Sequence, residues 1–460
     1  MALPSDFIAR TRALLGDAFP RLEAALQTVP PVSIRLNRPK GTTLPDASEP
    51  VAWCESGYYL PQRLSFTFDP LFHAGAYYVQ EASSMFLEQA VRAYVSEPVK
   101  CLDLCAAPGG KSTHLLSVLP EGSLLVSNEV IRARSHILAE NLCKWGNPFH
   151  IVTNNDPEEI GRLVHSFDVV VADVPCSGEG MFRKDAGSSD EWSVANVRLC
   201  ASRQRRILHD VWDALKPGGL LIYSTCTYNT EENEENVHYL IEEFGAEALP
   251  IPTQAEWNLT GPLRFDHPVY RFFPHKTRGE GFFLAVLRKA DGEREEIRLK
   301  TKTPKEKKTS APTLPAVIAE WVRASHAYRT EIQNETIRLF PQAYDEAYRL
   351  IANQLRIVTA GVRLGEIKGK DLLPAHSLAL STLLNREAFP SVELDWEAAV
   401  SYLKKEALHL PAEIDKGYVL VCYKQTPLGF VKHLGNRANN LYPAEWRIRS
   451  GYLPEEIRTL

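Results

Sequence analysis

The chain has 460 residues, of which 44% are hydrophobic, and a formal net charge of −5. This length supports two or three domains and the composition suffices for globular cores, so we expect a soluble, folded, multidomain protein. The longest apolar runs are strand-sized, far short of the roughly 20 residues that a membrane-spanning helix needs. The net charge by itself gives no sign of nucleic-acid binding, so any basic footprint must be local.

The N-terminal segment, residues 1–19, carries Asp and two Arg and lacks an uninterrupted apolar stretch. It therefore predicts an amphipathic helix rather than a secretory signal, and a cytoplasmic location follows by default. The eight cysteines show no C-x-x-C pair and no repeated spacing of the kind that binds zinc. We therefore expect neither a metal site nor a disulfide framework.

From about residue 97 the sequence alternates apolar runs with helical stretches, which is typical of a doubly wound α/β sheet. The helices are expected at 112–119, 131–145, 195–215 and 231–244, the last opening on Thr230 with acidic residues in its first turn. The expected strands are VKCLDLC, GSLLVSNE, FHIVTN, FDVVVADVPC, GGLLIYSTC and GFFLAVLRK.

The rhythm ends after Lys289. Residues 298–315 combine six basic residues with three prolines, which indicates a solvated linker, although such a segment can also contact RNA phosphates. Residues 316–460 predict a second globular unit that is helical at first. It ends in the strand-like GYVLVCYKQTPLGFVKHLG, with a hairpin turn at 427–429.

The stretch LDLCAAPGGKST, residues 102–113, ends like a nucleotide-binding P-loop, but Cys105 stands where the first glycine is required. What remains is a strand, a tight turn with Gly109 and Gly110, and a helix start whose amides favour carboxylates or phosphates. Glu129 follows the next strand, where a carboxylate commonly binds a ribose diol. The pair fits NAD, FAD or S-adenosylmethionine, and the missing G-x-G-x-x-G lowers the dinucleotide option.

Further along, Asp173 and Cys176 follow one expected strand and Cys226 follows another. A lone cysteine there is more often a packing residue, but two cysteines with a nearby Asp favour chemistry. The C5 carbon of a pyrimidine is too electron-poor to attack a sulfonium methyl until a thiolate adds to C6. A second group must then help to remove the C5 proton and release the cysteine. Spacing alone does not say which cysteine attacks.

The segments DLCAAPGGK, DVPCSGEGMFRKD and YSTCTYNTEENE resemble the motifs of the RNA cytosine-5 methyltransferases, in particular the bacterial group that modifies 16S ribosomal RNA. SIRLNR, YYVQEASS and RFFPHKTRGEGFF extend the resemblance over residues 1–290, with weaker similarity beyond. It implies Cys226 as the nucleophile, Cys176 as the residue that helps product release, and Asp173 facing both cofactor and base. It also implies that S-adenosylmethionine is bound by Cys105, Ala106, Ala107, Pro108, Gly109, Gly110, Lys111, Glu129, Asp156 and Asp173.

The resemblance further implies a fold and a domain order. A Rossmann-like class I methyltransferase sheet occupies residues 96–290, between an N-terminal α+β RNA-binding module (1–95) and, after a basic linker (291–315), a C-terminal PUA-like α+β domain (316–460). Because the target base must be splayed out of folded RNA, basic and aromatic residues of the flanking modules are candidates for RNA contacts, together with Lys184 in the FRKD segment of the methyltransferase domain. These are Arg35, Arg38, Lys184, Arg437 and Trp446, although the aromatic rings could equally belong to the core.

The sequence therefore predicts a monomeric, cytoplasmic, S-adenosylmethionine-dependent RNA cytosine-5 methyltransferase, with 16S ribosomal RNA or the 30S subunit as partner and no metal. Two other functions share part of this sequence pattern. An NAD-linked oxidoreductase would share the glycine turn and the acidic residue but would not need Cys176 and Cys226. A non-catalytic RNA-binding or ribosome-assembly factor would not need both cysteines, Asp173 and an unbroken cofactor loop.

Overall fold

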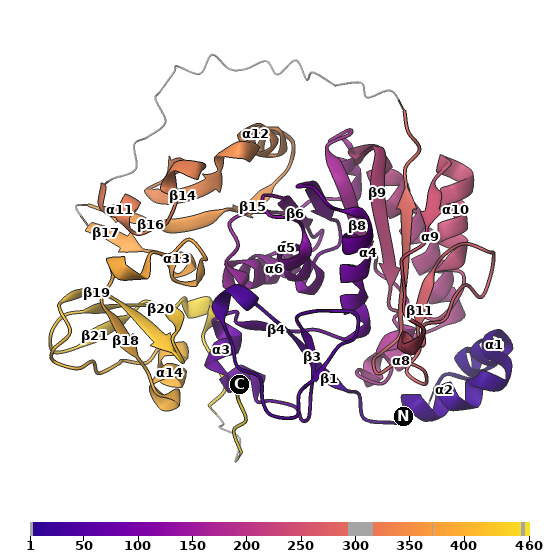
Figure 1. The fold of residues 1–460 in the computed structure, drawn as a ribbon, viewed down its shortest axis with the longest axis horizontal. Helices are drawn as coiled ribbons and strands as arrows, with labels where there is room; N and C mark the ends of the chain where they lie inside the picture. Colours follow the sequence, from indigo (N-terminus) through magenta and orange to yellow (C-terminus); the bar gives the residue numbers. More distant parts are fainter. Residues whose placement is uncertain (1–2, 293–315, 370, 452–455) are drawn as a thin grey trace.

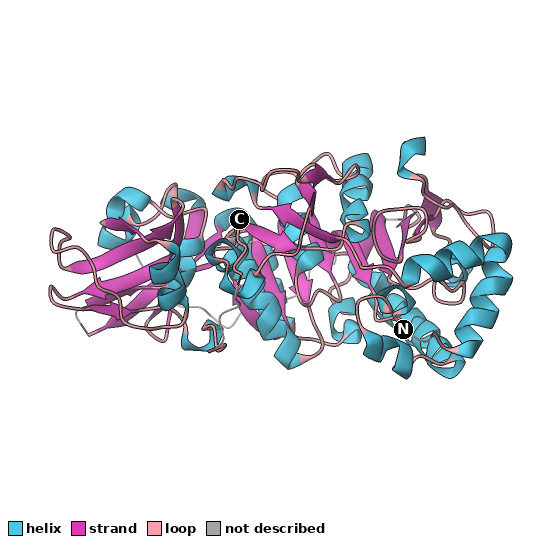
Figure 2. Ribbon diagram, turned by 90° about the horizontal axis from the view of Figure 1, so that it is seen from below, coloured by secondary structure: helices cyan, strands magenta, loops and turns pink. Residues whose placement is uncertain are grey.

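The structure, a computed structural model, describes residues 3–292, 316–369, 371–451 and 456–460. Most of the expected linker, 291–315, lies outside the described residues. An N-terminal module, a central α/β sheet and a C-terminal region pack against one another (Figure 1), and Figure 2 shows the C-terminal sheets at one end of an elongated molecule. None of the described helices combines the length and apolarity needed to cross a membrane.

The N-terminal module begins with two helices, α1 (Ser5–Leu15) and α2 (Phe19–Leu26). Their apolar faces pack on aromatic rings of the central domain, with the Phe7 and Phe182 ring centroids 5.0 Å apart. An antiparallel sheet follows in the order β2-β3-β1-β4. Its strands are β1 (Val32–Leu36), β2 (Glu49–Pro50), β3 (Gly57–Leu60) and β4 (Tyr77–Val79). The short helix α3 (Pro70–His73) lies between β3 and β4 in the chain.

The central sheet has nine strands, with β11 paired to β12 beside the path β10-β12-β9-β8-β5-β6-β7-β15. The chain runs from β5 through β6 to β7 and then returns to β8 on the other side of β5, which makes a topological switch point at β5. All six strands expected from the sequence are present. The bounds are β5 (Lys100–Asp103), β6 (Leu124–Asn128), β7 (His150–Thr153), β8 (Phe167–Asp173), β9 (Leu215–Thr225), β10 (Glu247–Leu249), β11 (Tyr270–Phe272), β12 (Phe282–Arg288) and β15 (Ile357–Ala360).

Helices cover both faces of this sheet, so its strands are apolar on both sides, as parallel strands require. One face buries residues of α7, α9, α10 and α12, and the other buries residues of α4 and α5. The Rossmann-like architecture expected from the sequence is confirmed. The bounds are α4 (Leu87–Tyr94), α5 (Gly110–Val118), α6 (Arg132–Trp145), α7 (Pro157–Gly161), α8 (Ala186–Glu191), α9 (Val194–Val211) and α10 (Glu234–Phe244).

The C-terminal region holds two four-stranded sheets, β13-β14-β16-β17 and β18-β19-β20-β21, and its strand β15 extends the central sheet beside β7. The strands are β13 (Tyr328–Gln333), β14 (Thr336–Pro341), β16 (Val362–Lys368), β17 (Asp371–Pro374), β18 (Ser391–Glu393), β19 (Gly417–Tyr423), β20 (Thr426–His433) and β21 (Ala438–Asn440). The helices are α11 (Ala316–Glu320), α12 (Asp345–Gln354), α13 (His376–Leu380) and α14 (Trp396–Leu403).

Two expectations for this region were wrong. The helical start is confined to the five-residue α11, and the hairpin of β13 and β14 follows it. The turn between β19 and β20 lies at Lys424 and Gln425, whose φ values are 46° and 61°, while residues 427–429 belong to β20. Positive φ at both central residues matches the twist of the flanking strands, so this geometry overrides the Pro and Gly signal.

The start of α10 also differs from the expectation. The helix begins at Glu234 rather than at Thr230, so the preceding acidic residues do not form its first turn. The Glu232 side chain is fully buried and accepts hydrogen bonds from the loop that follows β8. Glu234 stands in the first turn of the helix as expected, so Glu234 and Glu235 complement the helix dipole, while tertiary contacts hold Glu232.

Candidate active site

The structure brings Cys176 and Cys226 together. Cys176 follows β8 and Cys226 follows β9, and these two parallel strands are neighbours with Asp173 opposite Ser224. The two Sγ atoms lie 3.1 Å apart, and the backbone N–H of Cys226 donates to Cys176 Sγ. Hydrogen bonding with Cys226, burial and the Glu232 carboxylate raise the pKa of the Cys176 thiol well above its usual value. Cys176 therefore keeps its proton at neutral pH.

Asp173 ends β8 and is held from two sides. Lys111 Nζ lies 2.7 Å from Asp173 Oδ2, and the Ser224 hydroxyl donates to Oδ1 over 2.7 Å. Burial by itself lowers the pKa of Lys111, but the charge and hydrogen bond of Asp173, together with the nearby Asp103 and Cys226, outweigh burial and raise the pKa. A fixed ammonium, carboxylate and hydroxyl thus stand beside the thiol pair, at the carboxyl edge of the sheet.

The loop from Cys105 to Lys111 leads from β5 into α5. Gly109 has a φ of 114°, a left-handed conformation that glycine tolerates, and no side chain caps the helix that starts at Gly110. Arg134, on the following helix α6, anchors the loop by donating a hydrogen bond to Ala107 O. The first amides of α5 are therefore left without a side-chain acceptor, as an anion-binding helix start requires.

Glu129 and Asp156 follow the next two strands, β6 and β7. Glu129 is only 3% exposed; its Oε1 accepts from the N–H of Ile131, and Oε2 lies 3.6 Å from Arg134. Asp156 caps α7 and accepts from the N–H of Glu158. A carboxylate at the end of β6 beside an uncapped helix start is a donor and acceptor set that fits S-adenosylmethionine.

Sequence reasoning missed Asp103, the last residue of β5. Its Oδ2 accepts from the Ser112 hydroxyl over 2.6 Å, while Oδ1 is buried with no hydrogen-bond partner among the described residues. Burial raises its pKa to about 7. Its position at the carboxyl end of the first strand was the signal that could have identified it.

Arg35 was expected to contact RNA, and the structure corrects this. The side chain is fully buried between the N-terminal module and the central domain. It donates to Gln80 and Thr113, and its guanidinium stacks 4.4 Å from the Trp145 ring centroid. A guanidinium engaged in this way cannot reach an RNA phosphate, so its role is to join the two units.

The other four candidates for RNA contacts are exposed or half-buried. Arg38 is largely exposed and pairs with Glu55, and Lys184 and Arg437 are exposed. Trp446 is half-buried, with its ring 5.2 Å from that of His376.

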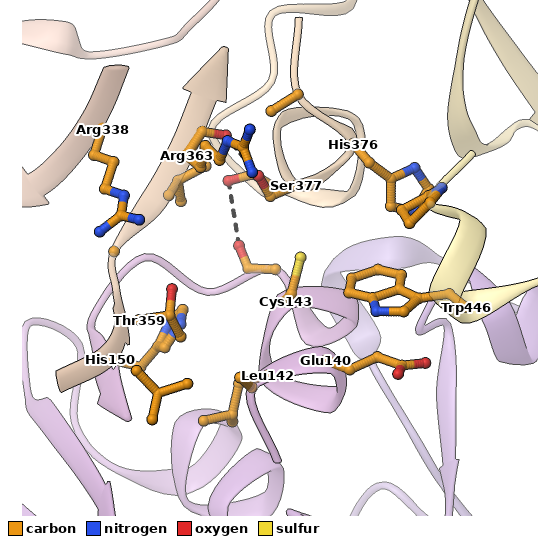
Figure 3. Close-up of a pocket in the computed structure, with 18 of the residues that line it drawn as sticks. Glu140, Leu142, Cys143, His150, Arg338, Thr359, Arg363, His376, Ser377 and Trp446 are labelled. Atoms are coloured by element: carbon orange, nitrogen blue, oxygen red, sulfur yellow. Dashed lines mark hydrogen bonds between the residues drawn. The ribbon is translucent and has the colours of Figure 1, made fainter. Parts of the chain in front are cut away.

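A cavity of about 810 Å³ lies away from the thiol pair, neither of whose cysteines lines it. It lies between α6, β16, α13 and the segment ending at Trp446, and Arg338, Arg363 and Cys143 are among the residues of its wall (Figure 3). Its walls come from the central domain and the C-terminal region. Of the site residues expected from the sequence, Trp446 alone lines it.

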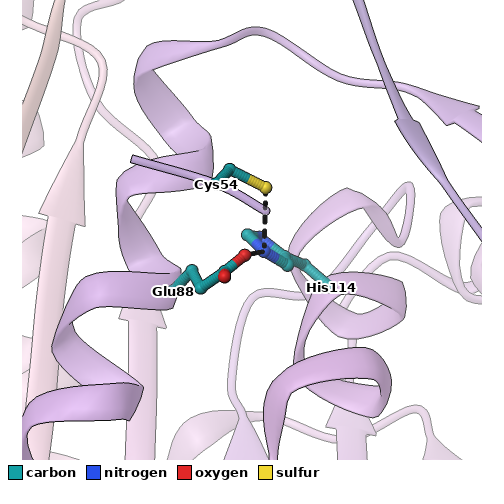
Figure 4. A group of neighbouring side chains, drawn as sticks. All are labelled: Cys54, Glu88 and His114. Carbon is teal, nitrogen blue, oxygen red and sulfur yellow. Dashed lines mark hydrogen bonds and ion pairs between the residues drawn. The ribbon is translucent and has the colours of Figure 1, made fainter. Parts of the chain in front are cut away.

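One group among the described residues has the composition of a metal site: Cys54, Glu88 and His114 (Figure 4). His114 Nε2 lies 3.1 Å from Glu88 Oε2 and 3.7 Å from Cys54 Sγ. Arg92 binds the other Glu88 oxygen, and the charge of Arg35 also acts on Glu88 and Cys54. Burial raises the pKa of Cys54 to about 12. A neutral thiol between paired charges indicates a hydrogen-bonded core cluster.

Comparison with solved structures defines the class of the protein. A methyltransferase homologue from Pyrococcus horikoshii is 28% identical, with a TM-score of 0.53 over 62% of this chain and 95% of that one. The structure of NSun6 from Pyrococcus horikoshii with SFG is 19% identical, with a TM-score of 0.54 over 63% and 99%, and shares the fold. The central domain is thus that of a Rossmann-like methyltransferase.

The family follows from three matches along the chain. Residues 3–82 match the N-terminal domain of 16S rRNA methyltransferase RsmF, residues 94–288 match 16S rRNA methyltransferase RsmB/F, and residues 389–448 match the methyltransferase RsmF PUA domain. Ribosomal RNA small subunit methyltransferase F of Shewanella oneidensis is 31% identical over 89% of this chain and 87% of its own length. The Klebsiella pneumoniae protein is 29% identical over 98% and 97%. The chain belongs to the 16S rRNA methyltransferase RsmB/F family.

Proposed function

We propose that this protein methylates the C5 carbon of cytosine in 16S ribosomal RNA, with S-adenosylmethionine as the methyl donor. The observation that carries the proposal is the 3.1 Å approach of two cysteine sulfurs beside Asp173 at the carboxyl edge of a methyltransferase sheet. Family membership supports the reaction type and the RNA substrate.

Residues 105–111, Glu129, Asp156 and Asp173 are proposed to hold the cofactor, which supplies an electrophilic methyl group when bound. The uncapped start of α5 offers amides to a carboxylate, and Glu129 offers an acceptor to a ribose hydroxyl. Asp103, with one unpartnered oxygen, joins this set as an acceptor toward the same pocket.

Cys226 is proposed as the nucleophile. Its thiolate adds to C6 of the cytosine, and the displaced electron pair makes C5 nucleophilic enough to take the methyl group. Asp173, which Lys111 and Ser224 hold in place, hydrogen-bonds the N3/N4 edge of the ring, where charge accumulates during addition. A base from the solvent then takes the C5 proton, the electron pair returns to the ring, and Cys226 is expelled as a thiolate that the neighbouring Cys176 thiol stabilises by a hydrogen bond.

RNA is proposed to contact all three parts of the chain. We divide it into an N-terminal RNA-binding module (1–95), the methyltransferase domain (96–290), a linker (291–315) and a C-terminal PUA-like region (316–460). Arg38, Lys184 and Arg437 are exposed and can reach phosphates, whereas Trp446 offers only a half-buried ring. We propose a monomeric enzyme that acts in the cytoplasm.

The test is transfer of labelled methyl from S-adenosylmethionine to deproteinised 16S RNA and to 30S subunits, with wild type and Cys226→Ala side by side. We expect label in 5-methylcytosine from wild type only, because loss of the nucleophile removes several orders of magnitude in rate. Normal turnover by Cys226→Ala would remove Cys226 from this role. Failure of wild type on both substrates would contradict the proposed function.

A further inference from the structure

The two cysteines stand on separate loops that must hold a fixed geometry. We call residues 174–181 the first cysteine loop and residues 226–233 the second cysteine loop. Each loop contains a buried glutamate, Glu179 in the first and Glu232 in the second, with exposed fractions of 2% and 0%. Each carboxylate receives hydrogen bonds from the opposite loop. The two loops are therefore tied in both directions.

Glu179 binds the second cysteine loop. Its Oε2 accepts from the Thr227 hydroxyl over 2.6 Å, from the N–H of Tyr228 over 2.7 Å and from the N–H of Asn229 over 2.9 Å. Its Oε1 accepts from Trp192 Nε1 and from the Asn229 side chain, both over 3.1 Å. The three residues directly after Cys226 are thus fixed to one carboxylate.

Glu232 binds the first cysteine loop in return. Its Oε2 accepts from the N–H of Ser177 over 2.9 Å and from Gln204 Nε2 over 2.8 Å, and its Oε1 accepts from the Asn229 side chain over 2.7 Å. Gln204 Nε2 also donates to Pro175 O. The residues on both sides of Cys176 are therefore tied to Glu232, one directly and one through Gln204.

Direct contacts bring the loops closer still. The Ser177 and Thr227 hydroxyls lie 3.0 Å apart, and the N–H of Gly180 donates to Cys226 O over 2.8 Å. A Cβ atom at Gly180 would stand 2.8 Å from that same carbonyl oxygen. The backbone of one loop thus lies directly against the residue that carries the other thiol.

The partners of both carboxylates in this network are donors. A glutamine would direct its NH₂ group at one set of these donors, leaving buried groups unpaired at a cost of about 1–3 kcal/mol each. The network consequently requires, at each position, a side chain of glutamate length with a hydrogen-bond acceptor at both oxygens. A surface or solvated acidic run, which the sequence TEENEE suggests, would carry no such requirement.

We propose that Glu179 and Glu232 are positioning residues that together set the placement of the two thiols for the covalent steps of methyl transfer. The proposal rests on the proposed function. Cys226 must approach C6 while Cys176 stands near the methylated C5, and a misplacement of about 1 Å in such an arrangement costs about 10²-fold in rate. The carboxylates act through the loops and touch neither substrate nor cofactor.

The experiment compares Glu179→Gln and Glu232→Gln with wild type in two measurements. In methyl transfer we expect kcat to fall about 10²-fold, while the KM values for S-adenosylmethionine and RNA change less than about twofold. In the second measurement, diamide oxidises the Cys176 and Cys226 thiols to a disulfide and is itself reduced to the hydrazine. Because the wild-type sulfurs already lie 3.1 Å apart, we expect both variants to form this disulfide at least about tenfold more slowly.

Asp69→Asn is the matched control. Asp69 is also fully buried and accepts from Leu71, Tyr77 and Leu460, but it joins the N-terminal module to the C-terminal end of the chain. We expect it to lower the melting temperature without changing kcat or the disulfide rate. Thr227→Val, which removes one donor to Glu179 with little change of shape, keeps the test decisive if a glutamine variant does not fold, and we expect about a tenfold fall in kcat.

Several results would overturn the proposal. These are unchanged kcat in the folded glutamine variants or in Thr227→Val, a fall in kcat with an unchanged disulfide rate, or an equal fall in kcat in Asp69→Asn. A wild type that forms the disulfide quickly but methylates no cytosine would instead contradict the proposed function, since the oxidation rate reports thiol placement without any substrate.

Discussion

The two halves of the carboxyl edge of the central sheet are built differently. At the ends of β8 and β9, the buried carboxylates Glu179 and Glu232 are saturated by hydrogen bonds from the chain itself. At the ends of β5 and β6, the start of α5 is uncapped, and Asp103 Oδ1 and Ser127 Oγ have no partner among the described residues. On the side proposed to carry the thiols both oxygens of each buried carboxylate are hydrogen-bonded, whereas on the side proposed to bind the cofactor Asp103 Oδ1 and Ser127 Oγ are left to pair.

The molecule thus separates the proposed reaction, at the ends of β8 and β9, from the proposed cofactor binding, at the ends of β5 and β6. Covalent chemistry depends on placement within a fraction of an ångström, which a saturated and buried network supplies before substrate arrives. Cofactor binding instead gains free energy when a ligand pairs polar groups that the protein leaves open. Mutations on the first side should therefore change rates, and mutations on the second side should change affinities.

The largest expected effect after loss of the nucleophile is that of Cys176→Ala. Cys176 keeps its proton at neutral pH because hydrogen bonding with Cys226, burial and nearby charge raise its pKa, so its thiol can donate a hydrogen bond to the Cys226 sulfur, 3.1 Å away, as that sulfur leaves as a thiolate. We expect turnover to fall about 10²- to 10⁴-fold and a covalent RNA adduct to accumulate, visible as a shifted band on a denaturing gel.

Cys422→Ala, in a buried position on β19, is the control thiol and should show no shifted band. A wild-type yield of methylated RNA from Cys176→Ala, without adduct, would exclude a release role. It would also contradict the assignment of reaction to this side of the sheet edge, because one of the two thiols held by the glutamate network would then be dispensable.

The convergence of Asp173, Cys176 and Cys226 could be predicted from the sequence. Each follows a strongly apolar strand, and parallel strands end at the same edge of a sheet. The network around them could not, because Glu179 finds its partners about 50 residues away and Glu232 stands in an acidic run that resembles a helix start. Polar side chains gain their partners through tertiary contacts, which periodicity does not report.

Arg35 shows the same limit from the opposite direction. In SIRLNRPK it looks like part of a basic surface, yet its partners Gln80, Thr113 and Trp145 lie 45 to 110 residues further along the chain. The doubly wound α/β sheet, by contrast, followed from the alternation of strands and helices alone, whereas the two flanking modules were expected from the family resemblance. The turn between β19 and β20 was misplaced because its central residues, Lys424 and Gln425, have positive φ without a Gly or Pro signal.

Glu129→Ala tests the side of the sheet edge that is proposed to bind the cofactor. Removing an ionised acceptor at the end of β6 should cost about 1.5–3 kcal/mol of binding, which is about a tenfold to hundredfold weaker affinity for S-adenosylmethionine by calorimetry. The disulfide rate of Cys176 and Cys226 should stay as in wild type. Glu158→Ala, at an exposed position on α7, provides the control. Unchanged affinity in Glu129→Ala would mean that the ribose is held elsewhere.

The smallest effect is expected far from the edge of the sheet, at Arg437. Its side chain is exposed and has no ion-pair partner among the residues that the structure describes. If it contacts a phosphate, Arg437→Ala should weaken RNA binding a few-fold at every sequence and lower the slope of log affinity against log salt by about 1. Arg349→Ala removes the same charge from α12 and should leave the slope unchanged. If both variants lost the same RNA affinity, Arg437 would act only through the net charge of the protein. A phosphate contact depends on position, whereas net charge does not.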